Sequence, residues 1–252
     1  MANKKLLINW LYYLPVGHVV ESLKIAKGYY LANKNLDVYL IINDESPKEL
    51  AQACPWIKKT YTVSLNEVKA QGIKTLQKIP KKWDYVITDN RAINFNKDYD
   101  NPELIKAHEL LKNFLIGDIH KGYVEQSGSA KVILPRVANP KITLNITRKA
   151  KQFAKKFKHN GPKIAIMLGG SAGGNQSPSV EMWLKICKAL YKSIPKLKIY
   201  FTGVSKSSKG RTSTRDFNLT DVDLLISKLP NAEKVYDVGL GNQIAFIASC
   251  NI

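Results

Sequence analysis

The chain has 252 residues, of which 44% are hydrophobic, enough to bury the core of one large domain or of two medium ones. No apolar run approaches the roughly 18 residues of a membrane span, so the sequence predicts no transmembrane helix. The net charge is +19, with 27 Lys/Arg against 14 Asp/Glu in residues 1–160 and 12 against 6 in residues 161–252. The excess is therefore spread over both halves and forms no single basic arm, which makes nucleic acid an unlikely partner.

The first half of the chain alternates strand-like and helix-like segments. Continuous apolar or β-branched runs predict buried strands at 5–10, 36–43, 58–63 and 83–90. Helical spacing predicts a helix at 19–32, and helix-start residues predict a second helix that begins near Pro47. A third helical stretch follows the strand 58–63 and ends at about Gln77. A fourth helix is predicted over 102–115, with Asn101 as its N-cap. This alternation predicts a parallel sheet with helices on both faces. Residues 117–140 are predicted to be mostly loop with one short strand.

A basic helix is predicted where the two halves meet. Ala150, Phe153, Ala154 and Phe157 form a narrow apolar stripe, and six basic residues lie between Arg148 and Lys158. Such a helix either lies on a membrane surface or packs on one domain as a linker, and the narrow stripe favours the linker. The sequence thus predicts a domain over 1–144, a linker helix over 145–161 and a second domain over 162–252.

The second half repeats the alternation. Strands are predicted at 163–168, 196–203 and 234–239, and helices at 179–194, at 219–229 with Thr220 as N-cap, and at 240–250. The chain ends where a fourth strand is expected, so we predict an incomplete second domain whose sheet edge is open to self-association. The predicted fold class is α/β, with two Rossmann-like parallel-sheet domains.

The clearest motif is "MLGGSAGGNQSPS", which follows the predicted strand 163–168. Its glycines allow the backbone to approach a ligand, and Ser177 is predicted to cap the next helix with Pro178 in its first position. Neither the Walker pattern nor GxGxxG is met, which disfavours a P-loop NTPase and a dinucleotide-dependent dehydrogenase. The interpretations left are a phosphate-binding loop, which the glycines and the helix start favour, and a flexible surface loop. The predicted phosphate-binding residues of the loop are Gly169, Gly170, Ser171, Gly173, Gly174, Asn175 and Ser177.

Other candidates follow predicted strands. Thr202 and Gly203 end the strand 196–203, at the edge where open α/β sheets bind ligands. Asp89, Asn90 and Arg91 end the strand 83–90 and either meet an acceptor or form a polar turn. His120 either enters the site or has no role, while Gln243, His108 and His159 are assigned to the surface. The histidines show no metal-ligand spacing, and no DxD-like pair is present, so no metal site is predicted.

Four stretches resemble the GT-B glycosyltransferases. "PVGHVVESLKIAKGYYLANKNLDVYLIIN" resembles the Gly-His segment that opens the first helix of nucleotide-sugar-dependent members. "KIAIMLGGSAGG", "IYFTG" and "YDVGLGNQIAFIASCNI" resemble the donor-binding half of heptosyltransferase-like members. Those enzymes usually carry an aspartate after the glycine, where this chain has His18. The resemblance implies a GT-B type fold and a nucleotide-sugar co-substrate without a further cofactor.

The resemblance also implies roles for individual residues. His18, following Gly17 at a strand-to-helix turn that faces the cleft between the domains, would accept the proton of an acceptor hydroxyl, because histidine exchanges protons near neutral pH. Glu21 would orient the ring. The alternative is that His18 only caps the first helix. Gly17 and Thr202-Gly203 would join the glycine loop in holding the diphosphate.

The predicted activity is therefore an inverting, metal-independent sugar transfer from a nucleotide-sugar to an unknown acceptor. The alternative is a degenerate glycosyltransferase that binds a nucleotide or a partner without turnover. Three cysteines, odd in number and without CxxC spacing, argue against disulfides and predict a cytoplasmic protein. The basic surface adds a peripheral contact with an acidic membrane surface as a further expectation.

Overall fold

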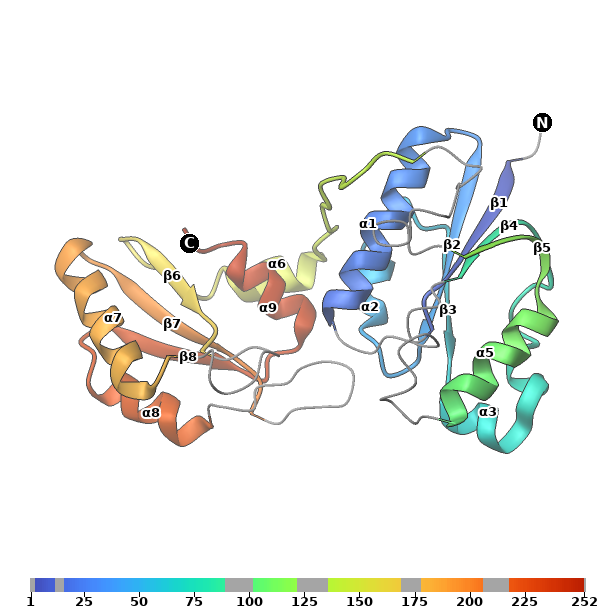
Figure 1. The fold of residues 1–252 in the computed structure, drawn as a ribbon. Helices are drawn as coiled ribbons and strands as arrows, with labels where there is room; N and C mark the ends of the chain where they lie inside the picture. Colours follow the sequence, from blue (N-terminus) through green and yellow to red (C-terminus); the bar gives the residue numbers. More distant parts are fainter. Residues whose placement is uncertain are drawn as a thin grey trace. The chain divides into compact units, whose positions relative to one another are not determined.

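The computed structural model of the chain describes residues 3–11, 16–88, 102–121, 136–168, 178–205 and 218–251. The chain divides into two compact units, with the boundary between Asn145 and Ile146. Each unit is built on a parallel β-sheet with helices on both faces (Figure 1). Within the described ranges, no helix combines the length and the apolar character that crossing a membrane requires.

The first unit has a five-stranded parallel sheet in the order β3-β2-β1-β4-β5. Its strands are β1 (Lys4–Asn9), β2 (Leu36–Asn43), β3 (Lys59–Val63), β4 (Lys82–Thr88) and β5 (Ile116–Lys121). Its helices are α1 (Val16–Ala32), α2 (Lys48–Gln52), α3 (Leu65–Gln71), a 3-10 helix (Gly72–Leu76) and α5 (Pro102–Phe114). The strand order reverses between β1 and β4, and open α/β sheets bind ligands beyond the carboxyl ends of the strands at such a point.

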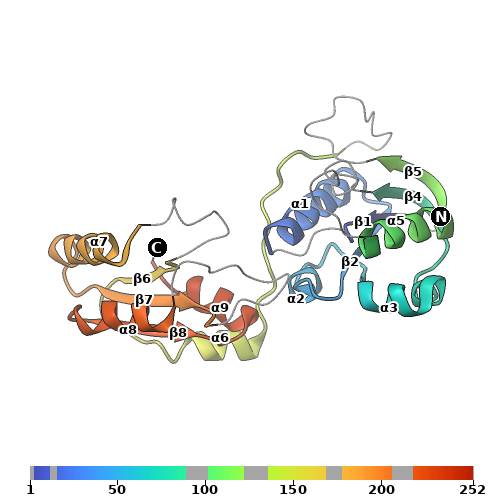
Figure 2. The same ribbon diagram turned by 60° about the horizontal axis from the view of Figure 1, so that its bottom comes forward.

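The core of this unit follows from the alternation of side chains along its strands. Leu7 and Val86 face α3 and α5, where they pack with Leu111, while Leu6 and Ile8 point to the opposite face. Helices α1 and α2 cover that opposite face (Figures 1 and 2). Because both faces are covered, β1 and β2 contain continuous buried apolar runs at residues 6–8 and 40–42, which is why these strands could be predicted from the sequence.

Residues 136–141, which follow the first sheet in the sequence, cross helix α1 at Gly28. The amide of Val137 donates to the carbonyl oxygen of Gly28 at 3.1 Å, and the Lys27 ammonium donates to the carbonyl oxygen of Lys141. A Cβ atom on Gly28 would lie 2.4 Å from the carbonyl oxygen of Val137 and 2.7 Å from Cγ of Arg136. The segment can therefore approach α1 this closely because residue 28 has no side chain.

The second unit has a three-stranded parallel sheet in the order β6-β7-β8. Its strands are β6 (Lys163–Ile166), β7 (Lys198–Gly203) and β8 (Ala232–Tyr236), and its helices are α6 (Arg148–Ala154), α7 (Val180–Ser193), α8 (Leu219–Ser227) and α9 (Leu240–Ile247). Helices α7 and α8 cover one face, where Cys187 and Val222 are buried against Phe201. Helices α6 and α9 cover the other face (Figures 1 and 2).

Aromatic side chains hold α6 and α9 on the sheet. The ring centroid of Phe157 lies 4.8 Å from that of Phe246 and 5.7 Å from that of Tyr200, both in edge-on geometry. Ala150 and Ala154 of α6 are buried against Ala245 of α9. The basic helix predicted at the junction is thus a short element whose apolar stripe packs within the second unit.

Several helix starts differ from their predicted positions. Helix α1 begins at Val16, three residues before the predicted start, so that His18 lies inside its first turn. The N-cap of α7 is Ser179, whose hydroxyl accepts from the Met182 amide, rather than Ser177. The N-cap of α8 is Asn218 rather than Thr220, because Asn218 and Asp221 form a reciprocal capping box. The predicted cap Asn101 lies outside the described residues.

The chain has three cysteines. Cys54, Cys187 and Cys250 are all free thiols. Burial raises the pKa of the Cys54 thiol to about 12 and that of Cys187 to about 11. Buried thiols of this kind are unreactive and behave as small apolar residues of the core.

Candidate functional site

Only some of the predicted site residues lie in the part of the chain that the structure describes. The structure describes Gly17, His18, Thr202, Gly203 and the backbone of His120. The predicted acceptor residues Asp89, Asn90 and Arg91 lie outside the described residues. The same holds for the whole glycine loop, with Gly169, Gly170, Ser171, Gly173, Gly174, Asn175 and Ser177.

His18 lies in the first turn of α1, which follows β1 at the carboxyl edge of the first sheet. The side chain of His18 is 40% exposed, and its Nδ1 atom lies 3.6 Å from Oε2 of Glu21, which is 30% exposed. The pair stands at i and i+3, so both side chains project from one face of the helix, while Val19 and Leu23 anchor α1 on the sheet. Glu21, which the sequence analysis expects to orient the ring of His18, thus lies next to it.

The strand order brings the carboxyl ends of β1, β4 and β5 together at one edge of the sheet. Asn9, the last residue of β1, is paired with Thr88, the last residue of β4. Asp89 follows Thr88 directly in the sequence, and His120 of β5 is paired with Ile87 of β4. The carboxyl ends of β1, β4 and β5 are thus neighbours, on either side of the point where the strand order reverses.

In the second unit, the end of β7 meets the first turn of α9. Thr202 is only 1% exposed, and its Oγ1 atom accepts a hydrogen bond from Nε2 of Gln243 at 3.2 Å. Gly203 is buried against the ring of Tyr236, which a Cβ atom on residue 203 would approach to 3.0 Å. Thr202 and Gly203 therefore position the strand end and α9, and Gln243, assigned to the helix surface from the sequence, belongs to this cluster.

Asp237 ties the ends of β7 and β8 together. Its amide donates to the carbonyl oxygen of Gly203 at 3.2 Å, and its carboxylate accepts from the amide of Ser205 at 2.9 Å. Burial, and then the neighbouring Asp237 carboxylate, raise the pKa of the Tyr236 phenol. Ser205, two residues beyond β7, is therefore held at the edge from which α9 begins.

The N-terminus of α9 is open toward a ligand. Its N-cap residue is Gly239, at φ 80°, and no side chain caps the helix, whereas Thr147, Ser179 and Asn218 cap α6, α7 and α8. A Cβ atom on Gly241 would meet no atom within 4 Å. Uncapped amides at a helix N-terminus attract anions, phosphate above all. The sequence signal that could have found this site is the glycine pair of "VGLG" directly after a predicted strand.

No cluster of three metal-ligating side chains occurs in the part of the chain that the structure describes. The chemistry that this edge offers consists of backbone amides and small polar side chains around α9. Such an edge suits a bound anion whose charge is stabilised by helix amides.

No family model matches the sequence, and no curated protein sequence matches it significantly. In three dimensions the chain is similar to E. coli ADP-heptose lps heptosyltransferase II, at 13% identity and a TM-score of 0.59, over 98% of this chain and 77% of that one. It is similar to the glycosyl transferase family 9 protein from Veillonella parvula DSM 2008, at 15% identity and a TM-score of 0.67, over 100% and 75%. It is also similar to E. coli heptosyltransferase WaaC with ADP, at 12% identity and a TM-score of 0.51, over 92% and 81%.

At these identities the likeness shows the fold. The chain is an α/β protein of the GT-B type, with Rossmann-like parallel sheets, and the predicted resemblance to heptosyltransferase-like proteins is confirmed at this level.

Proposed function

We propose that this chain is a glycosyltransferase that moves a sugar from a nucleotide-sugar donor to an acceptor hydroxyl. The observation that carries the proposal is the uncapped N-terminus of α9, joined to the end of β7 through Gln243 and Thr202. It occurs in a fold shared with proteins described as heptosyltransferases, one of them as an ADP complex. An adenine nucleotide is therefore the first donor class to test.

In the proposed reaction, each unit has one task. His18 accepts the proton of the acceptor hydroxyl while the oxygen forms a bond to the anomeric carbon. The bond from that carbon to the diphosphate breaks, and the nucleoside diphosphate leaves with the electron pair. This single displacement inverts the anomeric configuration. The amides of α9, together with basic residues, stabilise the departing diphosphate without a metal.

The glycine loop keeps its predicted role in this proposal. Residues 169–177 follow β6, which lies next to β7 in the sheet. The loops that follow neighbouring parallel strands leave the sheet at one edge, so the loop and α9 start from the same edge. Asp89, Asn90, Arg91 and His120 keep their predicted role on the acceptor side.

A carboxylate at position 241 is expected to abolish the anion site without unfolding α9. Gly241→Asp introduces a negative charge in the first turn, which favours the helix but repels a diphosphate. We expect nucleotide binding to weaken at least about tenfold. The measurement is a thermal-shift titration with ADP, UDP, GDP and CMP and their sugar conjugates.

Gly241→Ala is the matched control, because its methyl group enters open space. It should bind the nucleotide nearly as well as the unchanged chain. If Gly241→Asp binds the nucleotide as well as the unchanged chain does, α9 is not part of the donor site. If no nucleotide stabilises the unchanged chain, the proposed donor site is wrong and the alternative, a degenerate module that binds a partner without turnover, takes its place.

We also propose that the second sheet self-associates through β6. This strand ends the sheet among the described residues, and the Asn251 amide donates to the carbonyl oxygen of Lys163 at 2.8 Å on its outer side. Beyond Lys163, which Asn251 pairs with, the outer edge of this strand at residues 164–166 can pair with another chain. Sedimentation velocity over a range of concentrations should show a dimer, and a monomer at every concentration would contradict this proposal.

A further inference from the structure

The second unit contains a pocket of about 620 Å³ that lies away from the proposed donor edge. It is formed by α6, by the segment that leads to β6, and by the end of α9. Lys163, which lines it, is the first residue of β6, whereas the donor edge is at the carboxyl ends of the strands. The two sites are therefore at opposite ends of the same sheet.

Positive charge dominates the lining of this pocket. Lys151, Lys155, Lys158, Lys163 and His159 contribute to it, and no carboxylate does within the described part of the chain. Residues 126–180 contain ten Lys/Arg and no Asp or Glu, and residues 240–252 contain no charged side chain. Both sides of the pocket therefore lack acidic residues that could neutralise the lysines locally.

Among the described residues of this unit, no ion pair involves a pocket lysine. The ion pairs seen among its described residues join Lys198 to Glu233 and Lys234 to Asp223, on β7 and β8. Four ammonium groups gathered without counter-charges repel one another, and a bound anion would relieve that repulsion.

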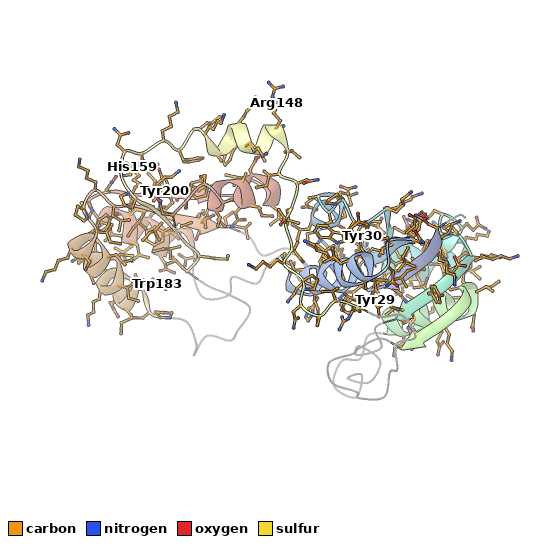
Figure 3. The ribbon with its side chains drawn as sticks, turned by 90° about the horizontal axis from the view of Figure 1, so that it is seen from above. Tyr29, Tyr30, Arg148, His159, Trp183 and Tyr200 are labelled. Atoms are coloured by element: carbon orange, nitrogen blue, oxygen red, sulfur yellow. The ribbon has the colours of Figure 1, made fainter. Side chains whose placement is uncertain are left out.

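Two of the basic groups are held in place. The Lys163 ammonium donates to the carbonyl oxygen of Phe157 at 3.3 Å and to the hydroxyl of Ser249 at 3.4 Å. Nε2 of His159 donates to the carbonyl oxygen of Lys196 at 2.6 Å, which fixes the ring. Figure 3 shows His159 beyond α6 and Arg148 at the start of that helix. Fixed donors lose little conformational entropy when a ligand binds.

Apart from Asn160 and Ser249, the rest of the lining is apolar. Ala154 and Phe157 from the α6 side face Ala245 and Ala248 of the α9 segment across it. The aromatic contacts of Phe157 with Tyr200 and Phe246 make this wall rigid. The volume lies within the usual range of small-molecule sites, in which a few polar groups orient a ligand against apolar walls.

We propose that this pocket binds a phosphate ester with an apolar part, held by Lys155, Lys158 and Lys163. Two sources can present this chemistry: a soluble phosphorylated compound, or the headgroup of an anionic phospholipid at a membrane surface. Because Lys155 and Lys158, which follow α6, are exposed, either source can reach the site.

The test uses the full chain, the double variant Lys155→Glu/Lys158→Glu, and the control double variant Lys185→Glu/Lys188→Glu. The control reverses two exposed lysines of α7 and changes the net charge equally. The soluble probe is phenyl phosphate, a phosphate ester with an apolar ring, titrated by calorimetry. The membrane probes are phosphatidylcholine vesicles with and without phosphatidylglycerol, assayed by co-sedimentation.

We expect the pocket variant to bind its probe at least tenfold more weakly, and the control variant to bind within about twofold of the unchanged chain. Binding of phenyl phosphate identifies the soluble source, and binding of phosphatidylglycerol vesicles alone identifies the lipid source. The pocket proposal is overturned if neither probe binds, or if both double variants weaken binding equally. Gly241→Asp should leave this binding unchanged, which separates the pocket from the donor site.

Discussion

Replacing His18 by alanine is expected to lower the rate of sugar transfer about 10²–10⁴-fold, the usual contribution of a general base. The substitution removes the group that accepts the proton of the acceptor hydroxyl. Nucleotide binding should be unchanged, because His18 belongs to the first unit and the proposed donor site to the second. The measurement pairs single-turnover release of the nucleoside diphosphate with the thermal shift that the same nucleotide produces.

Two further variants separate proton transfer from simple packing. His18→Gln keeps a polar side chain of similar size but cannot accept the proton at neutral pH, so it should be as slow as His18→Ala. Glu21→Gln removes the carboxylate that lies 3.6 Å from the ring, and it should cause a smaller loss with an altered pH profile. A His18→Ala variant that transfers sugar at the full rate would leave His18 with a structural role in the first turn of α1.

The largest expected effect on stability comes from Gly28→Ala. The new Cβ atom would lie 2.4 Å from the carbonyl oxygen of Val137, so the segment that crosses α1 must move and weaken its hydrogen bond to the helix. We expect a cost of about 1–3 kcal/mol, typical of overpacking. For a chain of this size that corresponds to a melting temperature lower by roughly 2–12 °C.

Gly17→Ala is the control in the same helix. A Cβ atom on Gly17 would meet no atom within 4 Å, and alanine favours helix by up to about 1 kcal/mol over glycine. Its melting temperature should therefore be unchanged or slightly higher. Equal behaviour of the two variants would mean that the segment at residues 136–137 does not need the glycine.

The candidate site could be predicted only in part. His18 was found because a histidine at a strand-to-helix junction is a local feature, and so was its neighbour Glu21. Gln243 was assigned to the surface because nothing near it in the sequence points to Thr202, 41 residues away. In the sequence, the lysine-lined pocket of the second unit is visible only as a basic helix. Its other residues cannot be found there, because Lys163 and Ser249, which are hydrogen-bonded to each other, lie 86 residues apart.

The sequence by itself determined the architecture. Apolar runs of strand length, alternating with helical periodicity, are properties of neighbouring residues, so they predict parallel sheets covered on both faces. The tertiary structure alone decided which distant residues meet. The segment at Val137 packs closely against Gly28, and β1 and β4 lie on either side of the point where the strand order reverses. Such pairings depend on how the packed elements fill space around one another, which no local pattern records.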